Sequence, residues 1–365
     1  MALHPLELPR EAALLFRVVV LQKRLLKALT PPTLTAASVT TGWVQQVWHD
    51  LDPEWVRRFC ELKRDKRTQL ERLQVIAAAP GPFRQALFDE FCRQNRSRVL
   101  FEAGGDFRDL ARLANVDAER AKAVREFFKV CYARFSHSSS DNWPGLALPG
   151  SRSLCNRDYK DAFRSRYPTS VVCPYCDGEI GTPELDHYLA KSAFPLLACS
   201  PRNLVPVCPS CNDANTAKGK RPAITEGDPR SMQDWLHPFF RPASSKVCIR
   251  LTGAPEDSIP RLSSTDPAEQ IRLDNHADLI RSLSERWTRI AASYFDSLSS
   301  KVSRTKTEHP AQLIDDIVID QLDDHQANRG REASTLIKAA VCRAILDNRS
   351  GYREELVDSN PVELN

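Results

Sequence analysis

Two pairs of cysteines constrain this chain more than any other feature of its 365 residues. Each pair has a two-residue gap, in Cys173-Pro-Tyr-Cys176 and in Cys208-Pro-Ser-Cys211. Such a gap lets both thiolates face one ion from a tight turn, and two pairs complete a tetrahedral site. That site is structural, because it leaves no open position for a substrate. The pattern therefore predicts one Zn²⁺ held by Cys173, Cys176, Cys208 and Cys211.

Two other interpretations of these cysteines stay open. Cys-Pro-Tyr-Cys is also a dithiol redox sequence, and Val171-Val172 before it could form the strand that precedes such a motif. A redox motif should open a long helix, whereas the residues from Asp177 to Gly181 are typical of a turn, and redox chemistry needs no second pair. Unrelated buried thiols are the other alternative. Cys199 is near enough to compete as a ligand, although its isolated position argues against it.

Polar residues of a second kind lie between and beside the cysteine pairs. Asp186 and His187 are adjacent, Asn203 follows, and Asn212 comes directly after the last cysteine. A histidine titrates near neutral pH and can take a proton from water. Carboxylate and amide oxygens are hard ligands suited to Mg²⁺ or Mn²⁺, which predicts Asp186 and Asn212 as metal ligands. The alternatives are an exposed charged pair at 186–187 and a simple turn asparagine at 203.

The local pattern places these groups on a strand pair and a helix. Residues 184–188 are expected to form a short strand, residues 203–207 its antiparallel partner, and residues 209–218 a helix. Neighbouring side chains on a regular strand point to opposite faces, so Asp186 and His187 can reach one site only where the strand ends or bulges. Asn203 is best interpreted as the residue that holds the intervening loop by hydrogen bonds.

This segment resembles the HNH endonucleases, also called ββα-metal or His-Me finger nucleases, in their zinc-knuckle form. The resemblance covers residues 168–245 and is carried by Cys173, Cys176, Leu185-Asp186-His187, Asn203-Leu204-Val205-Pro206-Val207, Cys208, Cys211-Asn212 and Lys218-Gly219. It implies that His187, Asn203 and Asn212 are the three residues of the family name. The third is usually His, so this chain is an HNN variant. The stretch from Leu185 to Lys191, with Phe194-Pro195 and Leu236-His237-Pro238-Phe239, is similar to standalone HNH proteins of bacterial phage-defence systems of the Septu type.

The predicted function is a metal-dependent endonuclease that hydrolyses phosphodiester bonds. His187 would be the general base, with Asp186 and Asn212 holding one Mg²⁺ or Mn²⁺ and Asn203 in support. DNA is favoured as the substrate and RNA stays open. A role in anti-phage defence, with a partner ATPase or sensor, rests on the resemblance alone. The alternatives are a zinc-organised nucleic-acid-binding module without activity and a redox or purely structural zinc protein.

The expected fold class is α+β and mainly helical, with a ββα-metal finger and its four-cysteine zinc site between two helical regions. The expected domains are a basic helical region at 1–140, the HNH domain at 141–250 and an acidic helical region at 251–365. A breaker-rich stretch at 138–151 separates the first two, and a Pro/Ser-rich linker is expected after about residue 250. Apolar periodicity predicts helices at 12–29, two in 44–79, 82–95, 118–135, 267–302, 311–326 and 332–346.

Charge is uneven along the chain, although the net charge is only +4. Residues 1–140 carry 23 Lys and Arg against 16 Asp and Glu, residues 141–250 carry 14 against 11, and residues 251–365 carry 14 against 20. Lys218, Lys220 and Arg221 cluster beside the expected finger helix, where they are predicted to contact the phosphate backbone. The densest basic run, in 57–67, is either a phosphate-binding surface or a solvated face.

No apolar run approaches the about 18–20 residues of a membrane span. The nearest, in 12–20, is broken by Arg17 and lacks the cleavage site of a secretory signal. Eleven cysteines without such a signal imply a reducing compartment. The expected location is cytoplasmic, with no membrane partner.

Overall fold

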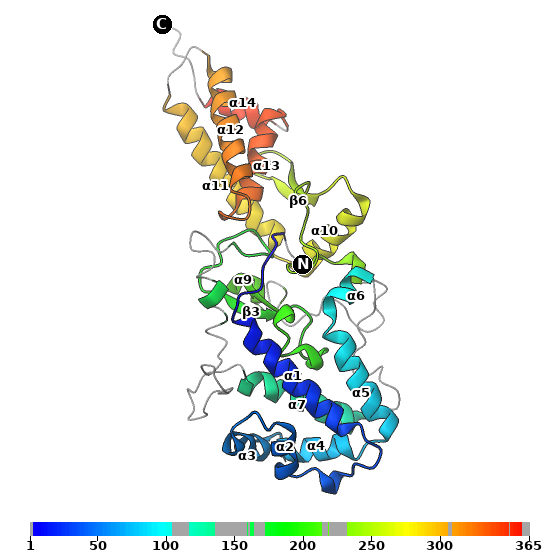
Figure 1. Ribbon diagram of the computed structural model, residues 1–365. Coiled ribbons are helices and arrows are strands. Elements are labelled where there is room, and N and C mark those ends of the chain that lie inside the picture. Colours follow the sequence, from blue (N-terminus) through cyan, green and yellow to red (C-terminus); the bar gives the residue numbers. More distant parts are fainter. Residues whose placement is uncertain are drawn as a thin grey trace.

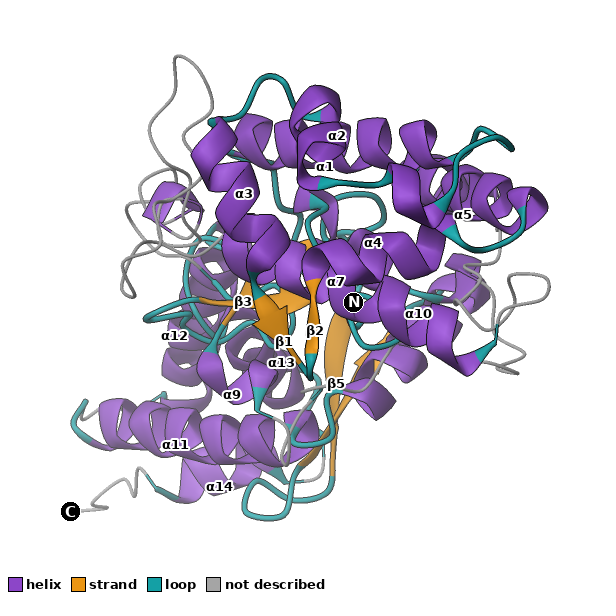
Figure 2. Ribbon diagram, turned by 90° about the horizontal axis from the view of Figure 1, so that it is seen from below, coloured by secondary structure: helices purple, strands orange, loops and turns teal. Residues whose placement is uncertain are grey.

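The structure is a computed structural model that describes residues 3–103, 117–135, 159, 161–163, 172–213, 218, 232–305, 309–349 and 351–359. Helices dominate these residues, and the strands form three separate two-stranded antiparallel sheets (Figure 2). Figure 1 shows an elongated molecule with the N-terminal helices at one end and the C-terminal helices at the other. The expected mainly helical α+β class is confirmed. The breaker-rich stretch at 138–151 lies outside the described residues.

The N-terminal end is built from amphipathic helices. Their bounds are α1 Ala12–Leu29, α2 Thr41–Val47, α3 Pro53–Glu61, α4 Gln69–Ala77, α5 Gly81–Gln94, α6 Ser97–Ala103 and α7 Ala118–Phe135. The expected helix at 12–29 is confirmed, and it ends before Pro31-Pro32, because proline disfavours helical geometry in the residue before it. Thr68 and Glu71 form a reciprocal cap at the start of α4. The expected helices at 82–95 and 118–135 correspond to α5 and α7.

The basic run between α3 and α4 forms a tight hairpin. Strands β1 (Lys63–Arg64) and β2 (Arg67–Thr68) pair antiparallel, and the two residues that join them, Asp65 and Lys66, have positive φ angles of 50° and 67°. Two consecutive residues with positive φ are characteristic of a two-residue hairpin turn. The twist of such a turn matches the twist of the strands that it joins. The expectation of two helices in 44–79 is therefore wrong, since the structure has three helices and this hairpin.

The middle of the molecule contains the cysteine pairs and a second antiparallel sheet. Strand β3 (Glu184–His187) pairs with β4 (Leu204–Val207) in a regular register that ends at the pair His187 and Leu204. The loop between them contains two short 3₁₀ turns, η3 (Pro195–Leu197) and η4 (Pro201–Asn203). The helix that follows, α9, covers only Pro209–Asn212. The expected helix at 209–218 is wrong in its length, because Asp213 already has extended backbone angles.

The C-terminal part begins with a hairpin where a linker was expected. Strands β5 (Cys248–Thr252) and β6 (Ile259–Ser263) pair over five residues each, and the turn contains Gly253 at φ 95°. The helices that follow are α10 Pro267–Leu279, α11 Leu283–Ser303, α12 Pro310–Ala327, α13 Thr335–Leu346 and α14 Tyr352–Asp358. The single helix expected at 267–302 is thus two helices, and α14 was not expected.

Two hydrophobic cores organise these elements. The first, here called the helical core, is formed by α1, α3, α4, α5 and α7. The second, here called the knuckle core, joins the cysteine pairs and β3–β4 to β5–β6 and the helices from α10 to α14. Residues of β4 divide between them, since Leu204 belongs to the helical core and Val205 and Val207 to the knuckle core. The β3–β4 sheet is therefore the element that lies between the two cores.

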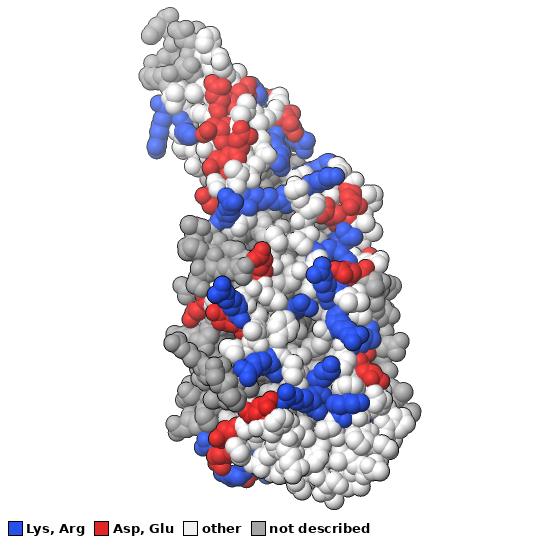
Figure 3. All heavy atoms as spheres, in the orientation of Figure 1, with Lys and Arg blue, Asp and Glu red and all other residues white. Residues whose placement is uncertain are grey.

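Figure 3 shows Lys and Arg side chains spread over the face formed by α1 and α5, while Asp and Glu gather over α12. None of the helices that the structure describes is both long and apolar enough to cross a lipid bilayer.

Candidate functional site

The two cysteine pairs come together in one buried cluster. The Sγ atoms of Cys173, Cys176, Cys208 and Cys211 all lie within 4.8 Å of one another. Each pair forms a turn, closed by a hydrogen bond from the Cys176 amide to the Cys173 carbonyl (3.3 Å) and from the Cys211 amide to the Cys208 carbonyl (3.0 Å). Among the described residues, this is the one group of three or more His, Cys, Asp or Glu side chains close enough to hold a metal.

The cluster fits a zinc ion in both size and chemistry. Four sulfurs at about 2.3 Å from a tetrahedral Zn²⁺ are about 3.8 Å from each other. The Sγ atoms of Cys176 and Cys208 are 3.8 Å apart. Burial raises the pKa of the Cys173 thiol well above its usual value, and a bound cation would stabilise the sulfurs of the cluster as thiolates. The arrangement is closed and thus suits a structural rather than a catalytic ion.

The C-terminal helices supply the surroundings of this cluster. From α11, Arg286 Nη2 donates to Cys211 Sγ (3.3 Å) and Trp287 Nε1 donates to the Cys176 carbonyl (3.0 Å). From α10, His276 Nε2 donates to the Tyr175 carbonyl (2.6 Å). Because the neighbouring groups of a metal site orient its ligands, these contacts tie the cysteine turns to helices that lie 75, 101 and 111 residues later. Nothing in the local sequence around the cysteines indicates these partners.

Asp177, directly after the first pair, links three distant segments. Its carboxylate accepts from His4 Nε2 (2.6 Å) and from the backbone amide of Leu336 (2.7 Å), and its carbonyl accepts from the Ser334 amide (2.5 Å). Asp177 therefore caps the first turn of α13, which is a favourable place for a negative charge. Its φ of 60° belongs to the sharp turn that the first cysteine pair makes.

The two faces of β3 carry different partners. Glu184 and Asp186 are on one face and Leu185 and His187 on the other, as the alternation of a regular strand requires. Glu184 accepts a hydrogen bond from Asn212 (Oε2 to Nδ2, 2.6 Å). Leu185 packs against the helical core. Asp186 and His187 are thus brought to the same strand end, but their side chains contact different neighbours.

Asp186 is 3% exposed and has a buried cation beside it. Its Oδ2 accepts from the Tyr175 hydroxyl (2.8 Å), and its Oδ1 accepts from Lys218 Nζ (2.8 Å). The Lys218 ammonium is fully buried and also donates to the carbonyl of His187 (2.9 Å). Lys218 was expected to contact phosphate at the surface. In this structure its charge instead neutralises Asp186. Lys220 and Arg221, expected beside it, lie outside the described residues.

His187 is held between a carbonyl and an aromatic ring. Its Nε2 lies 3.1 Å from the Ala198 carbonyl oxygen, and its ring meets that of Tyr132 edge to face at 4.5 Å. Burial lowers the pKa of His187 to about 3, and the nearby Lys191 charge acts in the same direction. The imidazole is therefore neutral at pH 7. Since the carbonyl can only accept, the proton is on Nε2, which leaves a lone pair on Nδ1.

Asn203 makes three side-chain hydrogen bonds to the loop between the strands. Its Oδ1 accepts from the Leu189 amide (2.8 Å), and its Nδ2 donates to the carbonyls of Leu189 (3.0 Å) and Leu197 (3.2 Å). All three partners are backbone groups, and Asn203 is buried. These bonds hold the start and the end of the loop together, so Asn203 positions the segment that follows His187.

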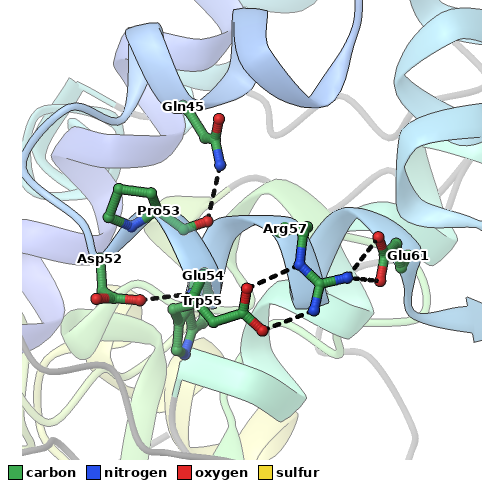
Figure 4. A network of polar contacts seen from close by, with 7 residues as sticks. All are labelled: Gln45, Asp52, Pro53, Glu54, Trp55, Arg57 and Glu61. Atoms are coloured by element: carbon green, nitrogen blue, oxygen red, sulfur yellow. Dashed lines mark hydrogen bonds and ion pairs between the residues drawn. The ribbon is translucent and has the colours of Figure 1, made fainter.

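The other predicted features are separated from this strand end. Cys199 accepts a hydrogen bond from Gln22 of α1 (3.4 Å) and is not part of the four-cysteine cluster. In the basic run, Arg57 makes hydrogen-bonded ion pairs with Glu54 and Glu61 on the same helix (Figure 4). Arg67 pairs with Glu119. These exposed pairs favour the solvated-face interpretation of the run.

Comparison of the chain with protein-family models, with curated proteins and with solved structures gave no match.

Proposed function

We propose that this protein is a phosphodiester hydrolase of the HNH type, in which a zinc-bound four-cysteine cluster supports a neutral histidine that activates water. The observation that carries the proposal is the state of His187. Its Nε2 proton is directed to the Ala198 carbonyl, which leaves the lone pair of Nδ1 to accept a proton. Burial lowers the pKa of His187 to about 3 and thus makes it a weak base in this structure. Tyr132 fixes the plane of the ring. The resemblance to HNH endonucleases supplies the substrate class, with DNA favoured over RNA.

The donor chemistry at the end of β3 also suits a divalent cation. The Asp186 carboxylate already pairs with a buried cation, the Lys218 ammonium. A positive charge is therefore stabilised beside this carboxylate. Asp186 and Asn212 would hold Mg²⁺ or Mn²⁺, whose charge would neutralise the scissile phosphate. Under this proposal the ion and Lys218 compete for Asp186 Oδ1, and Asn212 would bind the ion through Oδ1 while its Nδ2 donates to Glu184.

The residues of the chain divide the remaining work. His187 accepts the proton of the attacking water at Nδ1. Asn203 bonds to the carbonyls of Leu189 and Leu197 and so holds the loop between the strands. The Ala198 carbonyl, which orients His187, belongs to this loop and is thereby kept in position. The zinc cluster keeps β4 and α9 in place, so that Asn212 stays beside β3.

The test is a cleavage assay with supercoiled plasmid and with a structured RNA, each with Mg²⁺ or Mn²⁺ and with a chelator as control. His187→Ala should lose about 10²–10⁴-fold in cleavage rate, the effect of removing a general base, with unchanged zinc content. Phe59→Leu, on α3 in the helical core, serves as a matched control for small losses of packing. A His187→Ala protein that cuts as fast as wild type would refute the role of His187.

One observation favours a second candidate, a zinc-organised nucleic-acid-binding module without activity. Asp186 is already paired with Lys218, and His187 is only 8% exposed. A protein that binds nucleic acid in a gel-shift assay and cuts none under any metal condition would establish this alternative. Association with an ATPase or a sensor in anti-phage defence is part of our proposal on the resemblance alone, and co-purification tests it.

A further inference from the structure

A polar cavity lies away from β3, between α12, α13 and the chain that leads into β5. Its volume is about 210 Å³, and α12 and α13 pack side by side along it (Figure 1). The polar residues that line it are Ser245, His325, Gln326, Arg329, Thr335 and Arg343. No Asp or Glu is among its described lining residues. The lining therefore offers positive charge and hydrogen-bond donors without a carboxylate.

Arg329 is fixed in place but keeps its charge. Its Nη1 donates to the carbonyls of Ser245 (2.9 Å) and Val247 (3.1 Å), and its Nη2 donates to that of Ser244 (3.0 Å). Carbonyl oxygens orient a guanidinium without neutralising it. Arg329 thus contributes a rigid positive charge to the cavity wall, with little conformational entropy left to lose on binding an anion.

Arg343, on the opposite wall, makes no hydrogen bond or ion pair through its side chain with any residue that the structure describes. It is half-buried in α13, two turns after Thr335. A guanidinium presents five N–H donors in a planar fork that matches the oxygens of phosphate or carboxylate. Two arginines thus line one cavity, and one of them has no partner in the described chain.

Two further polar atoms beside the cavity lack partners. The Thr335 hydroxyl and His325 Nδ1 are buried, and neither has a hydrogen bond within the described part of the chain. Leaving a buried polar group unpaired costs about 1–3 kcal/mol, so such groups in a native protein indicate a missing partner. Thr335 is also the first residue of α13, whose positive N-terminal end is already capped by the Asp177 carboxylate.

The nearest buried carboxylate is already occupied. Asp177 accepts from His4 and from the Leu336 amide and forms no ion pair with Arg329 or Arg343. Burial lowers the pKa of Arg329, and the Asp177 charge acts in the opposite direction. Asp324, on α12, accepts a hydrogen bond from the Asn328 side chain (2.9 Å). The positive charge of Arg329 and Arg343 is therefore available to a ligand.

We infer that this cavity binds a small molecule through its phosphate group. The donors come from two guanidinium groups and a hydroxyl, which together can surround a tetrahedral oxyanion. The cavity volume equals about seven water molecules in the liquid, which accommodates a phosphate and part of the group that carries it. This site is independent of the proposed nuclease function and uses none of its residues.

The test is calorimetric titration of the full chain with inorganic phosphate and, separately, with a mononucleotide 5′-phosphate and its unphosphorylated nucleoside. Saturable binding of either phosphate ligand, and none of the nucleoside, is expected. Arg343→Met removes the unpaired charge, keeps the aliphatic stem and should weaken binding roughly 10- to 100-fold. Thr335→Val, which removes only the hydroxyl, should weaken it by a smaller factor.

The matched control is Arg250→Met, which removes an exposed charge on β5 outside the cavity and should leave binding within about twofold. Tighter binding of the mononucleotide than of inorganic phosphate would identify a phosphorylated metabolite as the ligand, and equal binding would identify free phosphate. The inference is overturned if neither ligand saturates at millimolar concentration, or if Arg343→Met and Arg250→Met bind alike.

Discussion

The clearest consequence of the structure concerns the loss of one zinc ligand. Replacing Cys208 with Ser removes a thiolate from a cluster whose four sulfurs lie within 4.8 Å. Structural zinc contributes about 10–16 kcal/mol in small zinc-binding peptides, whereas whole domains are stable by only about 5–15 kcal/mol. The Cys208→Ser protein should therefore lose its zinc, and the segment between the cysteine pairs should not stay folded.

The contacts around the cluster define how far this unfolding spreads. Trp287 and His276 would lose hydrogen bonds to the carbonyls of Cys176 and Tyr175, and α13 would lose its cap at Asp177. Each neutral bond is worth about 0.5–1.5 kcal/mol and the charged cap about 1.5–3 kcal/mol. The sum, about 2.5–6 kcal/mol, is comparable to the stability of a domain, so the whole knuckle core should loosen.

Two measurements on the Cys208→Ser protein test this reasoning. Elemental analysis should find one zinc per wild-type chain and less than about a tenth of that in the variant. Hydrogen exchange should show lost protection in β3, β4 and α13, with protection retained in α1 and α5 of the helical core. Cys199→Ser is the control, because Cys199 is buried but contacts Gln22 and not the cluster. Full zinc occupancy in Cys208→Ser would refute the four-cysteine assignment.

Three other substitutions give equally direct tests. Arg286→Met removes the positive charge beside Cys211 and should weaken zinc affinity about 10–100-fold in a chelator competition assay. An unchanged zinc affinity would show that this contact does not support the cluster. Lys218→Met leaves Asp186 buried without its counter-ion and should destabilise the protein by about 3–5 kcal/mol. Added Mn²⁺ should restore melting temperature in this variant but not in wild type if Asp186 binds metal. Burial lowers the pKa of His276 to about 3 from 6.5, so its contribution to stability is complete above pH 6.5 and is lost as the pH falls toward 3. His276→Gln keeps a donor for the Tyr175 carbonyl but cannot be protonated. Between pH 7 and pH 5 its free energy of unfolding, measured by urea denaturation, should fall by about 2 kcal/mol less than that of the wild type. The two proteins should show the same fall if His276 is protonated in the folded state.

Local patterns in the sequence were sufficient for some of the helices and for the four-cysteine cluster. The bounds of α1 and α7 follow from apolar periodicity and from prolines, and the cysteine spacing alone indicated the cluster. The β5–β6 hairpin was missed although its pattern is local. Ile249 and Leu251 are buried while Arg250 and Thr252 are exposed, an alternation that the neighbouring prolines and serines obscured.

Contacts between distant segments were beyond local patterns. Asp177 caps α13 through the amide of Leu336, which lies 159 residues later, and no spacing rule connects the two. The hydrogen bond between Lys218 and Asp186 was not predicted, for a related reason. Beside Lys220 and Arg221, Lys218 has the sequence context of a surface cation, whereas its ammonium is buried against Asp186 of β3. Burial of a charge depends on which partner the fold provides, and the sequence near the residue does not contain that partner.

The position of the Lys218 ammonium determines what the end of β3 can do. Because Asp186 and His187 are neighbours on a regular strand, they reach one substrate only if the backbone turns where the strand ends, at His187. Lys218 bonds both to the carboxylate of Asp186 and to the carbonyl of His187, so one cation holds this turn in its present shape. A divalent ion that took its place on Asp186 would also free the carbonyl of His187. In the proposed nuclease, metal binding and the orientation of the base are therefore a single event controlled by Lys218. In the inactive alternative Lys218 stays where it is, and the strand end is purely structural.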